Sequence, residues 1–171
     1  MGHLKTVLKH KKTVLEHCIK CGIFYQGLMH DMSKFSPTEF REGIKYFQGT
    51  KSPNEAARAI NGYSLAWIHH KGRNRHHFEY WTDYNPETKV MSPVKMPLRF
   101  VKEMFCDRVA ATKVYKGKDY TPIAPYEYFK NGRAKKAMHP ETAALLEKLL
   151  IMLYEDGEDK TFRYIKNLKE Y

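Results

Sequence analysis

Apolar side chains recur at every third or fourth position over much of the chain, which is the spacing of an amphipathic helix. The pattern is clear from Leu4 to Ile19 and again from Pro140 to Tyr154, and a last amphipathic segment runs from Lys160 to Leu168. No segment alternates between apolar and polar residues in the way a half-buried strand does. The hydrophobic pattern therefore predicts an all-α protein with about six to eight helices.

Two serine–proline pairs mark further helix starts. The segments Ser36–Glu39 and Ser52–Glu55 each combine a capping box with a proline at the first helical position. They predict helices over Pro37–Phe47 and Pro53–His70. The remaining helices are expected over about Ile23–Met32 and Pro97–Tyr115.

Two segments interrupt the helical pattern. Trp81 to Lys95 mixes Asp, Asn, Pro, Thr and Ser and is expected to be an irregular loop, whereas Tyr120 to Ala137 is aromatic, proline-bearing and basic. Neither has the composition of a domain linker. With 171 residues the chain fits one helical domain, residues 1–171, in which the helices after about residue 120 could form a C-terminal appendage.

Composition adds a strong positive charge to this picture. The formal net charge is +11, which favours anionic partners such as phosphorylated small molecules, nucleotides, nucleic acid or acidic lipid. No apolar run approaches the roughly 20 residues of a membrane span, and no signal-peptide pattern opens the chain. A cytoplasmic protein without membrane association is therefore expected, while the oligomeric state does not follow from the sequence.

Cysteine is sparse and odd in number, with Cys18, Cys21 and Cys106. An odd count argues against a disulfide framework. Cys18 and Cys21 form a CxxC pair, but no second pair follows and both fall on the apolar pattern of the first helix. We interpret the cysteines as structural.

Histidine is concentrated in one part of the chain. Of nine histidines, four lie within nine consecutive positions: His69, His70, His76 and His77. A neutral imidazole is the commonest metal ligand near neutral pH, and carboxylates supply the charge that holds a divalent cation. The candidate ligands, in chain order, are His10, the adjacent pair His30 and Asp31, these four histidines, and Asp107.

Wide spacing between these residues is compatible with one site. A helical bundle brings separated side chains together because facing residues project into its centre. His69 and His70 point about 100° apart if they lie on a helix, so usually only one of them can reach a given metal, and the same holds for His76 and His77. Which of the four ligate stays open at this point.

The segment His30-Asp31-Met32-Ser33-Lys34 is similar to the His-Asp-x-x-Lys signature of HD-superfamily metal-dependent phosphohydrolases. His69-His70-Lys71-Gly72 resembles the double-histidine segment of the branch that hydrolyses cyclic dinucleotides. The chain lacks the Gly-Tyr-Pro of that branch, so its substrate is not carried over.

A second resemblance spans most of the chain. It is to a family of small bacterial and phage proteins without an established activity, and it rests on the following motifs: LKH at Leu8–His10, HDMSKFSPTEF, WIHHKGRNRHHFEYW, MPLRFVKEMFCD and HPET. Together the two resemblances imply a helical bundle of the HD-domain type.

The HD resemblance also implies ligand roles. His30, Asp31 and Asp107 would bind a metal with His10, while one or more of the other histidines, His70, His76 and His77, would complete a second metal site or meet the substrate. The cofactor expected is one or two divalent ions, with Mn, Fe, Co, Ni, Mg and Zn as the candidates.

Other side chains are candidates for catalysis and phosphate binding. Lys34 could neutralise a phosphate oxygen, because its spacing from Asp31 on a continuing helix keeps both on one face. Glu103 lies one helical turn before Asp107 and could orient a ligand or act as acid or base. The candidates are, for catalysis, Lys34, Glu103 and His70, and, for phosphate binding, Lys34, Lys71, Arg73 and Arg75.

These features predict a metal-dependent phosphohydrolase, a phosphomonoesterase or phosphodiesterase, that acts on a nucleotide or another small phosphorylated molecule through activated water. The alternative is a non-catalytic protein that binds nucleotide or nucleic acid on the same scaffold. Redox chemistry at a histidine-rich iron site is a third interpretation, because His and carboxylate also suit non-haem iron.

Overall fold

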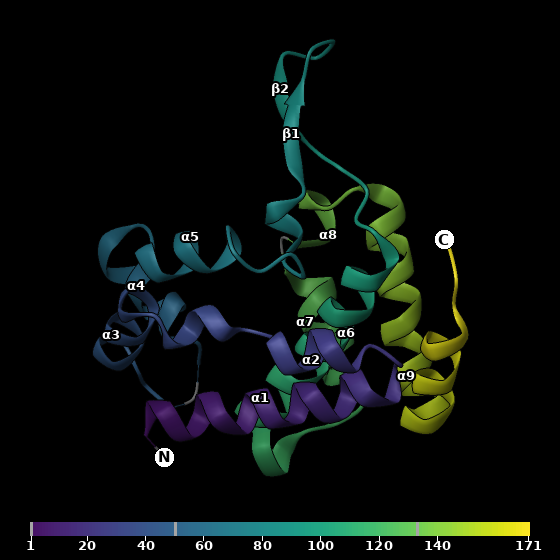
Figure 1. The fold of residues 1–171 in the computed structure, drawn as a ribbon, viewed down its shortest axis with the longest axis horizontal. Coiled ribbons are helices and arrows are strands. Elements are labelled where there is room, and N and C mark those ends of the chain that lie inside the picture. The colour runs from purple at the N-terminus through teal and green to yellow at the C-terminus, as the bar shows by residue number, and fades with distance from the viewer. Residues whose placement is uncertain (1, 50, 133) are drawn as a thin grey trace.

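Two long helices, α1 (His3–Lys20) and α6 (Leu98–Lys116), pack against each other, and α9 (Pro140–Asn167) packs against both. The computed structural model describes residues 2–49, 51–132 and 134–171 (Figure 1). Apolar side chains from the three helices form the main hydrophobic cluster, which includes Val14, Val101, Phe105, Leu146 and Leu150. The helical periodicity of the sequence therefore corresponds to burial along these helices.

A second group of helices lies at one end of α1 (Figure 1), with α3 (Pro37–Lys45) in contact with α4 (Pro53–Asn61) and α5 (Leu65–Lys71). α2 (Phe24–Met29) packs on α1 and leads into this group. The Ser36 side chain accepts a hydrogen bond from the Glu39 backbone N–H, as the capping box predicts, whereas Ser52 makes no such bond.

The single helix expected over Pro53–His70 is wrong. α4 ends at Gly62, whose φ of 79° is left-handed, and α5 begins after Ser64, which accepts a hydrogen bond from the Trp67 backbone N–H. Glycine adopts the left-handed conformation without steric cost and so ends helices. The break divides one apolar-periodic segment into two helices.

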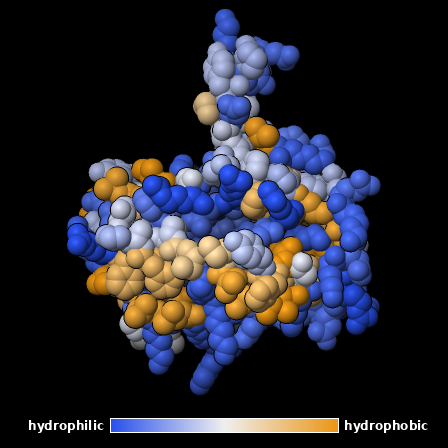
Figure 2. Space-filling view, viewed as in Figure 1, coloured by the Kyte–Doolittle hydropathy of each residue, from blue (hydrophilic) through white to orange (hydrophobic). Residues whose placement is uncertain are grey.

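The loop expected from Trp81 to Lys95 is also corrected. β1 (Thr82–Asn85) and β2 (Val90–Pro93) form an antiparallel hairpin, in which Tyr84 pairs with Met91. Figure 1 shows this hairpin projecting away from the helices, and Figure 2 shows it mostly in hydrophilic to neutral colours. Its strands are exposed on both faces, so no alternation of apolar and polar residues marks them.

The C-terminal third is helical. α7 (Ala124–Asn131) and α8 (Ala134–Ala137) precede α9, and α7 packs against both α6 and α9. α9 is kinked at Gly157, with φ 78° and ψ 173°, so its two parts correspond to the two amphipathic segments expected from the sequence. The described residues also include three short 3-10 helices: η1 (Met32–Phe35), η2 (Phe78–Tyr80) and η3 (Gly117–Asp119).

The protein is therefore mostly helical, as the sequence predicts, but all-α is too strict because of the hairpin. The described residues contain nine α-helices, α1 to α9, rather than six to eight. Within the described parts of the chain, no helix has the length and apolar character that a membrane span requires. The three cysteines are buried and unpaired in disulfides.

Candidate metal centre

Asp31 occupies the turn between α2 and η1. His30 caps the C-terminus of α2, and Asp31 then adopts a left-handed conformation with φ 55°. Aspartate tolerates this conformation better than most residues. The turn is held from α1, because the Lys11 Nζ donates hydrogen bonds to the backbone carbonyls of Leu28 and His30, both at 2.8 Å. Asp31 is buried in this turn. Its carboxylate lies close to side chains of both α1 and α5.

One oxygen of Asp31 belongs to a first cluster, made by His10, His30, Asp31 and Asp107. The Asp31 Oδ2 lies 3.7 Å from His10 Nε2 and 3.2 Å from His30 Nε2. The same two nitrogens lie 3.0 Å and 3.5 Å from Asp107 Oδ1. α1, the end of α2 and α6 therefore each contribute to one group of potential ligand atoms.

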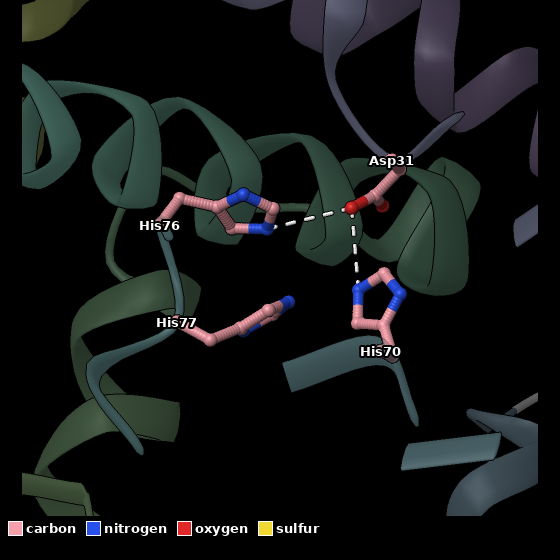
Figure 3. Close-up of side chains that lie close together, drawn as sticks. All are labelled: Asp31, His70, His76 and His77. Carbon is pink, nitrogen blue, oxygen red and sulfur yellow. Dashed lines mark ion pairs between the residues drawn. The ribbon is translucent and has the colours of Figure 1, made fainter. Parts of the chain in front are cut away.

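The other oxygen of Asp31 faces a second cluster, made by Asp31, His70, His76 and His77. Its Oδ1 lies 3.2 Å from His70 Nε2 and 3.5 Å from His76 Nε2, as the dashed lines in Figure 3 show. The His77 ring points toward the same space (Figure 3), 4.1 Å from the His76 ring centre to centre. One carboxylate thus joins two potential cation sites.

Several of the converging atoms have no hydrogen-bond partner among the described residues. They are His10 Nε2, His30 Nε2, His76 Nε2, His77 Nε2 and both carboxylate oxygens of Asp31, all buried. The Lys34 Nζ forms an ion pair with Asp31 Oδ2 at 2.5 Å, yet that oxygen makes no hydrogen bond of acceptable geometry. Buried polar groups without partners are costly, so this arrangement fits residues that coordinate divalent cations.

Two carboxylates hold the outer nitrogens of the histidine rings. The Glu103 Oε1 accepts from His30 Nδ1 at 2.9 Å and from His76 Nδ1 at 3.1 Å. The Glu39 Oε2 accepts from His70 Nδ1 at 2.7 Å. A proton on Nδ1 leaves the lone pair of Nε2 directed into the clusters, which is the form that binds a metal. Glu103 therefore lies behind the rings and orients them.

The pKa values of the carboxyl groups are consistent with this arrangement. Burial by itself raises the pKa of Asp31, but the charges of His30, Lys34 and His70 outweigh it and hold the pKa well below its usual range. Burial likewise raises the pKa of Asp107, but the adjacent rings of His10, His30 and His76 outweigh it and hold the pKa well below its usual range. Both carboxyl groups are therefore ionised near neutral pH.

The histidines differ in their pKa values. Burial lowers the pKa of His77 well below its usual value, and the neighbouring His76 and His70 lower it further, so this ring is neutral. Burial also lowers the pKa of His30, but Asp31 and the other carboxylates outweigh it and raise the pKa overall. A cation at the first cluster would take the place of a proton on His30, since ligation requires neutral imidazole.

The structure brings together seven side chains proposed as ligands or catalytic residues, in the two clusters described above: His10, His30, Asp31, His70, His76, His77 and Asp107. Lys34 lies against Asp31 although η1 and a left-handed residue replace the continuing helix expected from the sequence. Glu39 was missed, because its position in the capping box gave it a different expected role.

The basic residues after α5 lie differently. Arg73 donates from Nη1 to the His69 carbonyl, and the Arg75 guanidinium lies over the Tyr80 ring, 5.6 Å from its centre. In the described part of the chain neither forms an ion pair with a carboxylate of the clusters. His69 belongs to neither cluster, and its Nδ1 donates to Glu39 Oε1 at 2.6 Å.

The fold and this side-chain set define a mainly helical protein with a candidate two-cation centre. A family model described as "Family of unknown function (DUF5662)" matches residues 1–152, and the chain belongs to this family. The matched range contains every residue of both clusters and ends within α9. Neither the curated proteins nor the solved structures gave a match to this chain.

Proposed function

We propose that this protein is a metal-dependent phosphohydrolase of the HD type, which cleaves a phosphate ester of a nucleotide or another small phosphorylated molecule. The observation that carries the proposal is the position of Asp31. Its two oxygens face two clusters in which the Nε2 atoms of His10, His30, His76 and His77 are buried with no hydrogen-bond partner among the described residues. A carboxylate between two cation sites is the arrangement of two-metal phosphoesterases.

The donor set favours divalent transition metals. Imidazole suits Mn, Fe, Co, Ni and Zn, and the carboxylates of Asp31 and Asp107 supply negative charge. The first cation would be held by His10, His30, Asp31 and Asp107, and the second by Asp31, His70, His76 and His77. A bound divalent cation supplies hydroxide near neutral pH by lowering the pKa of water.

The remaining chemistry falls to the chain's own residues. Lys34 is positively charged beside Asp31, and burial lowers its pKa less than the carboxylates of Asp31 and Asp107 raise it. Its ammonium can neutralise a phosphate oxygen as negative charge develops. Glu103 and Glu39 hold His30, His76 and His70 in the orientation that ligation requires, and so act as positioning residues. The net charge of +11 favours the approach of an anionic substrate.

The test begins with metal analysis of protein purified without added ions. Hydrolysis is then measured with p-nitrophenyl phosphate, bis(p-nitrophenyl) phosphate and a panel of nucleotides in Mn²⁺, Co²⁺, Ni²⁺ or Mg²⁺. We expect turnover that Asp31→Asn abolishes, because asparagine keeps the left-handed turn but removes the charge. Asp83→Asn on the exposed hairpin is the matched control and should retain activity. Metal-loaded protein that turns over no compound of the panel would contradict the proposal.

A second function is supported by the exposed arginines beyond α5. Arg73 and Arg75 make no ion pair with the clusters among the described residues, and with Lys71 they form a basic segment that could bind nucleic acid or nucleotide without catalysis. Such binding would weaken steeply with salt, because it depends on the positive charges of these side chains. It would survive Asp31→Asn, because it does not require the metal. Binding of a labelled oligonucleotide by wild type and Asp31→Asn at two salt concentrations distinguishes the two functions.

A further inference from the structure

α2 packs on α1 through its glycine. A Cβ at position 27 would lie 2.6 Å from the Cβ of Cys18 and 3.2 Å from the Cα of Leu15, so a larger residue cannot make this close approach. Gly27 is buried, whereas Phe24 and Tyr25 of the same helix are 55% and 71% exposed. The packing therefore leaves the large apolar side chains of α2 on the surface.

The exposed apolar surface continues from α2 onto η1 and α1. It consists of eight large apolar side chains, each 39–71% exposed, which we call the apolar patch: Leu4, Leu8, Phe24, Tyr25, Leu28, Met29, Met32 and Phe35. Leu4 and Leu8 share a face of α1 with Lys11, whose Nζ reaches the carbonyls of Leu28 and His30. Figure 2 shows a band of orange and pale-orange side chains across this side of the molecule. So large an exposed apolar surface is typical of an interaction site.

Lysines border the apolar patch on α1. Lys5, Lys9 and Lys12 recur at helical spacing, so they form a stripe of the helix beside the stripe that contains Leu4 and Leu8. All three lysines are exposed. The N-terminal part of the chain thus combines an apolar surface with a positively charged border.

Few acidic residues offset this charge. Residues 2–35 contain six lysines and two acidic residues, which gives a net charge of six minus two, or +4. Of the two acidic residues, Glu16 lies 3.9 Å from Lys12, and Asp31 is buried in the candidate metal centre. A second copy of the chain would bring the same positive charge against the patch. Charge complementarity therefore favours a partner that is anionic at its surface and apolar beneath it.

We propose that the apolar patch docks on the surface of an anionic lipid bilayer. Phe24, Leu28 and Met32 enter the boundary between headgroups and acyl chains, and the lysines of α1 contact the anionic headgroups. The proposal goes beyond the proposed function. The expectation of no membrane association rested on the lack of a spanning segment, and docking at the surface needs no such segment.

The experiment measures binding of the full-length protein to sedimented vesicles. We expect vesicles with equal parts of phosphatidylcholine and phosphatidylglycerol to bind the protein at least about tenfold more tightly than phosphatidylcholine alone. Phe24→Gln with Leu28→Gln should weaken binding to the anionic vesicles at least about tenfold, and Tyr25→Ser about threefold, because less apolar area is buried. The matched control is Val90→Gln with Met91→Gln. It removes two similarly exposed apolar side chains from the hairpin and should leave binding unchanged.

The charged border is tested separately. Lys5→Gln with Lys9→Gln should weaken binding to the anionic vesicles at least about fivefold at low salt, since each lysine contacts the headgroups. Lys130→Gln with Lys136→Gln removes the same charge from exposed positions of α7 and α8, and should change binding less than about twofold. Circular dichroism checks the fold of every variant, and Tyr25→Ser keeps the test decisive if the double variant does not fold.

Three results would overturn the proposal. The first is equal binding to the two kinds of vesicle. The second is binding that the lysine variant loses and the Phe24 and Leu28 variant retains, which would reduce the interaction to attraction between charges. The third is a wild-type dimer in analytical ultracentrifugation that Phe24→Gln with Leu28→Gln dissociates, which would assign the apolar patch to a second copy of the chain.

Discussion

At the residue scale, the carboxylates behind the imidazole rings are as important as the ligands themselves. Glu103 accepts hydrogen bonds from both His30 and His76, and its second oxygen accepts from Gln26 Nε2 at 2.8 Å. An amide at this position cannot accept from all three donors, since one of its two polar atoms is an NH₂ group. Glu103→Gln should therefore weaken the hold on the His30 and His76 rings without leaving a cavity in the core.

We expect Glu103→Gln to lower the affinity for Mn²⁺ by about 10- to 100-fold, the usual effect of losing such an orienting contact. Metal titration by calorimetry measures this directly, and circular dichroism checks the fold. Glu87→Gln in the exposed turn of the hairpin removes the same charge and should leave the affinity unchanged. Equal affinities in Glu103→Gln and wild type would show that Glu103 does not orient the rings.

His17 gives a prediction that is independent of the metal centre. Its Nδ1 donates to the Cys106 carbonyl at 3.2 Å, and its Nε2 accepts from Lys113 Nζ at 3.1 Å, so the folded protein holds the ring neutral. Burial, followed by the charge of Lys113, lowers the pKa of His17 from 6.5 to about 4. In this pH window the unfolded chain binds a proton that the folded chain does not.

The free energy of unfolding should therefore fall as the pH decreases from 6.5 to about 4, by roughly 3 kcal/mol from this group, and the loss is complete below that range. His17→Gln should remove this part of the dependence. Urea unfolding of metal-free protein across the window measures the difference between the two curves. His139→Gln, at the start of α9, controls for loss of a histidine elsewhere, and parallel curves for wild type and His17→Gln would refute the assignment.

The sequence predicts much of the candidate site because its residue types are unusual. The density of histidines and the pair His30 and Asp31 identified residues that the structure brings together in two clusters. Glu39 could not be recognised, because a glutamate in a capping box already has an explanation.

At the element scale, periodicity predicts helices better than it predicts where they end. The helices from Leu4 and from Pro140 were found because one face of each is buried. The break at Gly62 was missed because apolar residues continue on both sides of it, and only the left-handed glycine separates the helices. The hairpin was missed because neither of its faces is buried, so its sequence carries no alternation.

The kink of α9 offers a test at this scale. Gly157 has φ 78° and ψ 173°, a conformation that is essentially restricted to glycine. The turn of the chain allows Phe162 to reach the core, where its ring contacts Phe105 edge to face at 5.9 Å between centres. A side chain at position 157 meets no neighbouring atom, so its cost arises from the backbone alone.

We expect Gly157→Ala to lower the free energy of unfolding by about 1–3 kcal/mol, measured by urea denaturation. Gly72→Ala is the matched control. Gly72 has φ −75° and ψ −14°, and a Cβ there makes ordinary contacts, so alanine should be neutral or slightly stabilising. If both variants unfold at the same urea concentration, the kink does not require glycine.

At the scale of the whole molecule, the candidate centre connects the two groups of helices. His10, Asp31 and Asp107 come from α1, the turn after α2, and α6. His70 comes from α5, which packs on α3, and His76 and His77 come from the segment that leads to the hairpin. A cation that bound these ligands would tie α5 and the following segment to the rest of the molecule.

Metal binding should therefore stabilise the native protein, and it should protect some segments from local unfolding more than others. Mn²⁺ at about 100 times its dissociation constant adds roughly 2.7 kcal/mol if only the folded state binds it, which corresponds to an increase in Tm of about 5–10 °C. Amide hydrogen exchange should slow most in α5 and in residues 76–80, and least in the second part of α9, which supplies no ligand. Asp31→Asn should abolish both effects. Uniform protection, or none, on addition of Mn²⁺ would mean that the two clusters do not bind a cation shared by the two groups of helices.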